Sequence, residues 1–185
     1  MGRWRRREFE KDRMLCVIAI IDSAATKRLA ILEQITERFG IPPQSVHGHI
    51  TLATYTGDEE AAFITSCKAI LSGYGKFSVC YDKIELWTAT SGARSVLVAA
   101  PQKGHEMAAI QRKIAGSWSA QLNEWTQEDT WTPHTTLLYV PGADLDLVAE
   151  AMRKEFAPFA AQIDRIDFSR VYENRYEIID SFELQ

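Results

Sequence analysis

Hydrophobic residues along the chain form short continuous runs that alternate with stretches in which every third or fourth residue is apolar. Met14–Ile21 is a continuous run rich in β-branched residues, which predicts a strand buried on both faces. Apolar residues at helical spacing between residues 29 and 39 predict an amphipathic helix. The same reasoning predicts further strands at His49–Tyr55, Phe77–Trp87, Ser95–Ala100, Thr135–Val140, Gln162–Ser169 and Tyr176–Phe182, and helices over 59–72, 107–122 and 145–157.

These elements occur in a repeated order. Strand, helix, strand, helix and strand follow one another twice, and one more strand ends the chain. The first strand of each repeat precedes a histidine by a similar distance, from Val17 to His49 and from Val96 to His134. We therefore expect an internal duplication with lobes at about residues 14–90 and 91–185. Because no Ser/Gly/Pro-rich linker separates them, the two lobes are expected to pack as one domain over 14–185.

Composition excludes several classes of protein. Hydrophobic residues make up 46% and charged residues 25% of the 185 positions, which is typical of a globular protein. The longest apolar run has eight residues, whereas a transmembrane helix needs about 20. The three cysteines, Cys16, Cys67 and Cys80, are too scattered for a disulfide framework or a zinc site, so a reducing cytoplasm is the expected location.

Charge is distributed unevenly. Residues 1–13 hold six Lys/Arg and three Asp/Glu, a local net charge of +3, and we expect this basic tail to be disordered. The other 15 basic and 22 acidic residues give the body a net charge of −7. Such a body lacks the broad positive field that long nucleic acids require, although a few local groups can still hold a small phosphate ligand.

A tetrapeptide occurs at equivalent places in the two repeats. It reads HITL at His49–Leu52 and HTTL at His134–Leu137. Alternate side chains of a strand share a face, so each strand is expected to present one imidazole and one hydroxyl to a common surface. A pseudo-twofold axis between the lobes would then bring two histidines and two threonines together across a cleft.

This arrangement suits the cleavage of a phosphodiester. A neutral histidine accepts a proton from the attacking water, and a protonated one donates a proton to the leaving oxygen. Imidazole has both forms available near neutral pH. The hydroxyls of Thr51 and Thr136 would hold the non-bridging phosphate oxygens. We expect no metal or other cofactor, because His47 and His49 form a pair without an evident third ligand.

With these two motifs, the chain resembles the two-histidine (2H) phosphoesterase superfamily, which includes 2′-5′ RNA ligase-like proteins and cyclic nucleotide phosphodiesterases. The resemblance covers nearly all of residues 14–183. It implies an α+β, bilobal and pseudo-symmetric fold, in which each lobe is an antiparallel-rich sheet with helices outside and a cleft lies between the lobes. It also implies that His49 and His134 are the acid/base pair, and that Thr51 and Thr136 are phosphate ligands.

One position separates two branches of this family. The RNA ligase-like branch commonly has arginine five residues after the second histidine, where this chain has Tyr139. An aromatic residue here resembles the cyclic phosphodiesterase branch. Strict strand alternation places Tyr139 on the face opposite His134, so a part in the site requires a twist or a bulge. Further candidates for substrate binding are Trp131, Tyr55 and His47, which flank the motif strands.

The sequence therefore predicts a metal-independent phosphodiesterase, expected to be monomeric, that hydrolyses nucleoside 2′,3′-cyclic phosphates or similar small cyclic phosphates. Either histidine can be the base. An enzyme of 2′-5′ RNA ligase or RNA-end-processing type, with RNA ends as partners, is the second hypothesis. A non-catalytic nucleotide- or RNA-binding module is the third, and a metal-dependent enzyme the fourth. No membrane partner is expected.

Overall fold

A computed structural model describes residues 14–185 of the chain except for residues 45–47, 89–93, 103, 142–144 and 172–175. The strands are β1 (Leu15–Ile21), β2 (His49–Tyr55), β3 (Phe77–Thr88), β4 (Arg94–Pro101), β5 (Thr135–Pro141), β6 (Phe159–Val171) and β7 (Tyr176–Glu183). The α-helices are α2 (Ser23–Glu33), α3 (Glu60–Leu71), α4 (His105–Trp118) and α5 (Asp146–Glu155). Short 3₁₀ segments are η1 (Gln34–Phe39), η2 (Ser119–Gln121) and η3 (Glu124–Thr126).

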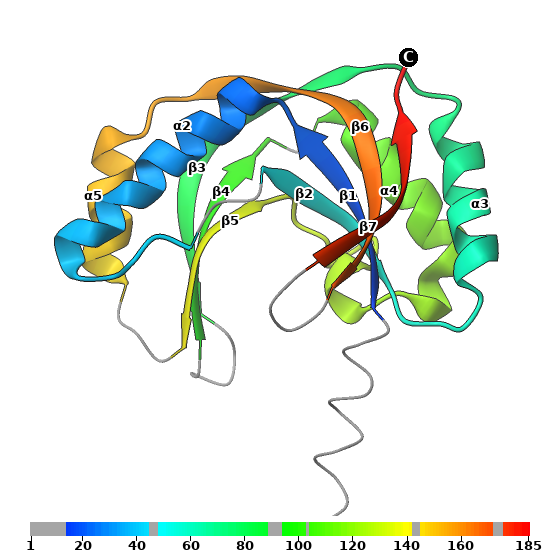
Figure 1. Ribbon diagram of the computed structural model, residues 1–185, viewed down its shortest axis with the longest axis horizontal. Coiled ribbons are helices and arrows are strands. Elements are labelled where there is room, and N and C mark those ends of the chain that lie inside the picture. Colours follow the sequence, from blue (N-terminus) through cyan, green and yellow to red (C-terminus); the bar gives the residue numbers. More distant parts are fainter. Residues whose placement is uncertain (1–13, 45–47, 89–93, 103, 142–144, 172–175) are drawn as a thin grey trace, which may run out of the picture.

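The strands form one seven-stranded sheet in the order β2-β1-β6-β3-β4-β5, and β7 pairs with β6. Every pairing between these strands is antiparallel. Figure 1 shows the sheet curved into an arch whose outer side carries the helices, α2 and α5 over one half and α3 and α4 over the other. We call the helix-free inner side the concave face. The predicted α+β duplication with outer helices is confirmed.

The two repeats exchange strands. β1, β2 and β3 of the first repeat correspond to β4, β5 and β6 of the second, so the strand order reads the same from either end. However, β6 pairs with β1, and β3 pairs with β4. Each half of the arch therefore takes one strand from the other repeat, and the predicted division near residue 90 describes the repeat in the sequence rather than the halves in space.

The first helix shows how local sequence sets the elements. Both Ala24 N and Ala25 N donate to Asp22 Oδ1 at 2.9 Å, which satisfies the open N-terminus of α2. The predicted helix over residues 29–39 continues as η1 and ends at Gly40, whose φ of 72° is the left-handed conformation that glycine tolerates. No helix in the described part of the chain combines the length and the apolarity needed to span a membrane.

Candidate active site

The two motif strands meet across the arch, although they lie at opposite ends of the strand order. The Thr135 hydroxyl donates to the His49 carbonyl at 2.8 Å, and Trp131 Nε1 donates to the Thr51 carbonyl at 2.8 Å. Residues of the second motif region thus hold the backbone of the first motif directly. Because Thr135 directly follows His134, this hydrogen bond joins the residue after one motif histidine to the backbone of the other.

A buried tyrosine completes this link. The Tyr81 hydroxyl lies 2.6 Å from Thr135 Oγ1, and both side chains are buried. The single Thr135 proton goes to the His49 carbonyl, so Tyr81 is the donor to Thr135. Burial raises the pKa of Tyr81, which keeps its hydroxyl protonated for this role. The Tyr81–Thr135–His49 chain therefore fixes one motif strand against the other.

Each motif strand carries a β-bulge at the same place. In β2, Thr51 and Ala53 pair with consecutive residues of β1, which leaves Leu52 as the extra residue. In β5, Thr136 and Leu138 pair with consecutive residues of β4, which leaves Leu137 as the extra residue. The fourth residue of both motifs is thus bulged, and the repeat extends to the backbone register.

Burial shows which face the motif side chains occupy. In β2, His49 and Thr51 are partly exposed, whereas Ile50 and Leu52 are fully buried toward the helices. The second motif follows the same pattern, with His134 partly exposed and Thr136 exposed. Each motif therefore presents its histidine and its threonine to the concave face, as alternation predicts.

The bulge in β5 returns Tyr139 to this face. Leu137 and Leu138 are both buried, so the alternation shifts by one residue and Tyr139 is 36% exposed. Gln44 holds the Tyr139 backbone on the open edge of β5, since its Nε2 donates to the Tyr139 carbonyl at 2.9 Å and its Oε1 accepts from Tyr139 N at 2.8 Å. Tyr139 consequently shares the concave face with His134 and Thr136.

The equivalent shift of side-chain alternation in β2 corrects the expectation that Tyr55 contributes to substrate binding. After the bulge at Leu52, Tyr55 points toward the helices and is 1% exposed. Its ring stacks on Phe63 with centroids 4.3 Å apart and meets the edge of Trp118 at 5.7 Å. Its hydroxyl accepts from Glu59 N at 3.0 Å. Tyr55 is a core residue and cannot stack on a bound base.

Trp131 also differs from its expected role. Only 4% of it is exposed, and its indole N–H is engaged by the Thr51 carbonyl. The ring is therefore part of the packing that joins the two motifs, rather than a surface for a base. His47, the remaining substrate-binding candidate, lies outside the described residues.

One ring nitrogen of His134 is engaged by the backbone. The Thr132 carbonyl lies 2.9 Å from Nδ1, and a carbonyl can only accept, so Nδ1 carries a proton and Nε2 is the nitrogen left for proton transfer. The ring also meets Trp87 edge to face, with centroids 4.6 Å apart. Burial lowers the pKa of His134 from its ordinary value of 6.5, while the bond to Thr132 opposes this shift. The neutral form therefore dominates near neutral pH.

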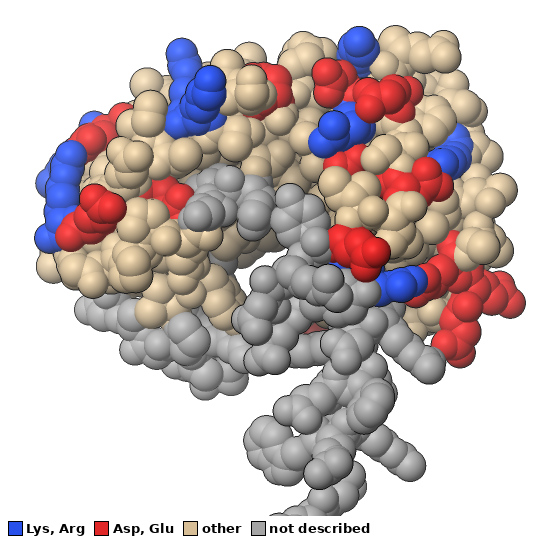
Figure 2. All heavy atoms as spheres, viewed as in Figure 1, with Lys and Arg blue, Asp and Glu red and all other residues tan. Residues whose placement is uncertain are grey.

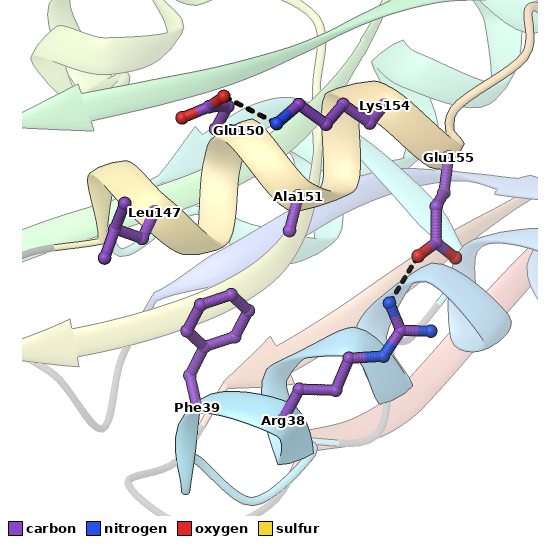
Figure 3. Close-up of a pocket in the computed structure, with 7 residues that line it drawn as sticks. All are labelled: Arg38, Phe39, Leu147, Glu150, Ala151, Lys154 and Glu155. Carbon is purple, nitrogen blue, oxygen red and sulfur yellow. Dashed lines mark hydrogen bonds and ion pairs between the residues drawn. The ribbon is translucent and has the colours of Figure 1, made fainter.

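In the described part of the chain, neither a metal-binding cluster nor the other hollow is an alternative to this candidate site. The described residues hold no group of three His, Cys, Asp or Glu side chains that could bind a metal ion. A hollow of about 320 Å³ lies between η1 and α5, and no residue of β2 or β5 lines it (Figure 3). Two ion pairs border it, Glu150–Lys154 at 2.7 Å and Arg38–Glu155. Its other lining side chains are apolar, and no histidine lines it.

The family follows from a match over most of the chain. A family model described as the 2′-5′ RNA ligase superfamily matches residues 22–175. The chain belongs to the 2′-5′ RNA ligase superfamily. This group is the two-histidine phosphoesterase superfamily predicted from the H-x-T-L motifs, and its members are phosphoesterases and RNA ligase-like enzymes. No curated protein matches the chain significantly in sequence.

Solved structures support the fold of this superfamily member. TT0787 of Thermus thermophilus has a TM-score of 0.64 at 13% identity, with 92% of this chain and 97% of that chain covered. E. coli LigT complexed with 3′-AMP has a TM-score of 0.57 at 12% identity, with 93% of this chain and 97% of that chain covered. Kluyveromyces marxianus Usb1 has a TM-score of 0.57 at 8% identity, with 94% of this chain and 99% of that chain covered. At these identities the likeness shows a common fold.

Sequence reasoning did not find several residues that shape this site, among them Tyr81, Thr135, Gln44 and Trp87. Thr135 breaks the alternation with a polar side chain at a buried position, where the first motif has Ile50, and this difference was a usable signal. Gln44 and Trp87 gave no comparable signal, because their contacts with Tyr139 and His134 join segments far apart in the chain.

Proposed function

We propose that this protein is a metal-independent phosphodiesterase that opens nucleoside 2′,3′-cyclic phosphates. The observation that carries the proposal is the pair of H-x-T strands joined by the Thr135–His49 hydrogen bond, with His134 Nδ1 engaged by the backbone so that Nε2 is left for proton transfer. Two imidazoles and two hydroxyls on one concave face suit a phosphate bound between them.

Burial of His134, which lowers its pKa, favours one assignment of roles. His134 Nε2 takes a proton from water as the water oxygen bonds to phosphorus. The bond from phosphorus to one ribose oxygen breaks, and protonated His49 supplies the proton that this oxygen needs. Thr51 and Thr136 donate hydrogen bonds to the non-bridging oxygens as negative charge develops on them. The product is a nucleoside 2′- or 3′-monophosphate.

Ligands of a structural relative are consistent with this chemistry. E. coli LigT has been crystallised with 3′-AMP and with phosphate. 3′-AMP is the compound formed when the bond from phosphorus to O2′ of 2′,3′-cyclic AMP is hydrolysed. A fold of this kind can therefore hold a nucleotide of the product class proposed for this chain.

The direct test is to incubate the protein with each of the four nucleoside 2′,3′-cyclic phosphates, with and without a chelator, and to identify the products. We expect monophosphate formation that the chelator does not change. Loss of turnover on chelation would instead indicate a metal-dependent enzyme. Tight nucleotide binding with no product after long incubation would indicate a binding module.

RNA-end processing is the second candidate, because the superfamily description names RNA ligation. It would use the same four motif residues but needs a cationic track for the strand. On the face shown in Figure 2, the described Lys and Arg side chains lie scattered among Asp and Glu. A steep fall of RNA affinity with salt concentration would favour this candidate over the cyclic phosphodiesterase.

The pH dependence of catalysis follows from His134. A base acts in its neutral form, so kcat/KM should rise with pH through the pKa of His134. Because burial lowers this pKa, the rising limb should lie below the ordinary value of 6.5. A profile measured from about pH 4.5 to about pH 8 checks this expectation. A rising limb above 6.5, with chemistry rate-limiting, would contradict the assignment of His134 as the base.

A further inference from the structure

An arginine shares the concave face with the motif histidine of β2. His49 pairs with Ile20 of β1, and Ile20 pairs with Arg165 of β6. Directly paired residues of a sheet point to the same side, so the three side chains form one row. Neighbouring strands are about 4.8 Å apart, which places Arg165 about 10 Å from His49 along the row. A nucleotide whose phosphate lies at His49 can extend its base toward Arg165.

A buried carboxylate holds this arginine in place. Arg165 Nε lies 2.9 Å from Asp167 Oδ1, and the Ser181 hydroxyl donates to the same oxygen at 2.7 Å. Asp167 has an exposed fraction of 0%, and neither its Oδ2 nor Arg165 Nε has a hydrogen-bond partner among the described residues, so the contact between the two side chains is an ion pair. Burying a carboxylate with one oxygen unpaired is costly, so this ion pair is poorly explained as a device for stability. Its evident effect is to orient the guanidinium.

The outer part of the guanidinium remains available. An arginine has five N–H donors in a planar fork. Asp167 is the partner that the described part of the structure gives to Arg165, through Nε, and 40% of the Arg165 side chain is exposed. The two terminal amino groups can therefore donate a pair of parallel hydrogen bonds to a ligand on the concave face.

The surrounding charge determines which ligand fits. Asp167 already balances the charge of Arg165, and Glu183 of β7 pairs with Arg165 on the other side in the same row. A second phosphate would meet two carboxylates here, whereas an uncharged ligand with two adjacent acceptors would not be repelled. Guanine offers such a pair at O6 and N7, and cytosine offers one at O2 and N3. Adenine and uracil have a donor beside each acceptor on their accessible edges.

We propose that Arg165 is a specificity-determining residue that recognises the base of the substrate through two adjacent acceptors, and so selects guanosine and cytidine over adenosine and uridine. This inference rests on the proposed function, because it assumes that the phosphate lies at the two motif histidines. It assigns a base-recognition role to the Arg165–Asp167 pair on β6.

The test compares kcat/KM for the four nucleoside 2′,3′-cyclic phosphates between the wild-type protein and Arg165→Met and Arg165→Lys. The wild-type protein should prefer the guanosine and cytidine substrates by about tenfold or more, as one bidentate contact discriminates. Both variants should lose this preference, because lysine keeps the charge but not the fork. Turnover of the adenosine and uridine substrates should change by less than about twofold. Comparing the guanosine and cytidine results shows which acceptor pair is used.

Arg112→Met is the matched control. Arg112 lies on the outer helix α4 in an exposed ion pair with Glu128, so its loss should leave the base preference unchanged. Two results would overturn the inference: equal turnover of all four substrates by the wild-type protein, or an equal loss of kcat/KM on all four in Arg165→Met. Neither result would contradict the proposed phosphodiesterase activity. A preference of the wild-type protein for 5′-phosphorylated substrates that disappears in Arg165→Met would overturn it in favour of a second phosphate.

A binding measurement separates this inference from the proposed function. Calorimetric titration with the four nucleoside 3′-monophosphates needs no turnover. Tighter binding of the guanosine and cytidine compounds, lost in Arg165→Met, would support base recognition even if no cyclic phosphate were hydrolysed. Equal affinity for all four compounds would overturn it.

Discussion

Replacement of His134 by alanine should lower kcat/KM for a nucleoside 2′,3′-cyclic phosphate by about 10²–10⁴-fold, the usual contribution of a general base. The variant removes the Nε2 lone pair that accepts the proton of the attacking water, and it should also remove the rising limb of the pH profile. His49→Ala should cause a loss of similar size through the missing general acid. Steady-state kinetics with continuous product detection measures both effects.

The matched control is His105→Ala. His105 is an exposed residue at the start of α4, a helix on the outer side of the arch, so its removal should leave kcat/KM within about twofold of the wild-type value. Circular dichroism of all three variants shows whether the fold is retained. If either motif variant folds and turns over at the wild-type rate, the two-histidine mechanism is wrong.

Replacement of the motif threonines by valine should lower kcat by about 10²–10³-fold, the range found when one donor to a developing oxyanion is removed. Valine has nearly the same shape as threonine and also favours a strand, so Thr51→Val and Thr136→Val should fold normally. Both hydroxyls lie on the concave face, where Thr51 is partly exposed and Thr136 is exposed. The loss should appear in kcat more than in KM, because the hydrogen bonds strengthen as charge develops.

Serine variants provide the internal check, since Thr51→Ser and Thr136→Ser keep the hydroxyl and should recover most of the rate. Thr65→Val tests for nonspecific effects. Thr65 is an exposed residue of α3 whose hydroxyl donates to the Ala61 carbonyl at 2.8 Å, so this change should not affect kinetics. Valine variants as active as their serine counterparts would show that these hydroxyls do not contact the phosphate in the transition state.

Local patterns in the sequence were sufficient to predict the helices and strands and the face of the sheet on which the motif side chains lie. β2 was predicted at His49–Tyr55 and begins and ends at those residues. The partly exposed positions of His49 and Thr51 follow from alternation over three residues, which no distant contact alters. The duplication was visible because both copies retain the same motif at equivalent places.

Long-range pairing and register could not be predicted in the same way. The pairing of β6 with β1 depends on which distant strand offers a complementary edge, and hydrophobic periodicity contains no such information. The bulges at Leu52 and Leu137 depend on the register of the neighbouring strand, so strict alternation assigned the wrong face to Tyr139, and the burial of Tyr55 could not be predicted. The burial of Asp167 could not be predicted either, because the sequence of a strand of mixed polarity does not distinguish a buried carboxylate from a surface one.

The contact between β2 and β5 has a consequence for the size of ligand that the protein can admit. Among the described residues, side-chain donors such as Thr135 and Trp131 join these two strands, and no ladder of backbone hydrogen bonds does so. Each such bond contributes only about 1 kcal/mol. Widening the seam between the two strands would also expose the buried side chains of Trp131 and Thr135 and leave Thr135 without its partners, so these few bonds hold the strands at one spacing and should restrict the site to small phosphate esters.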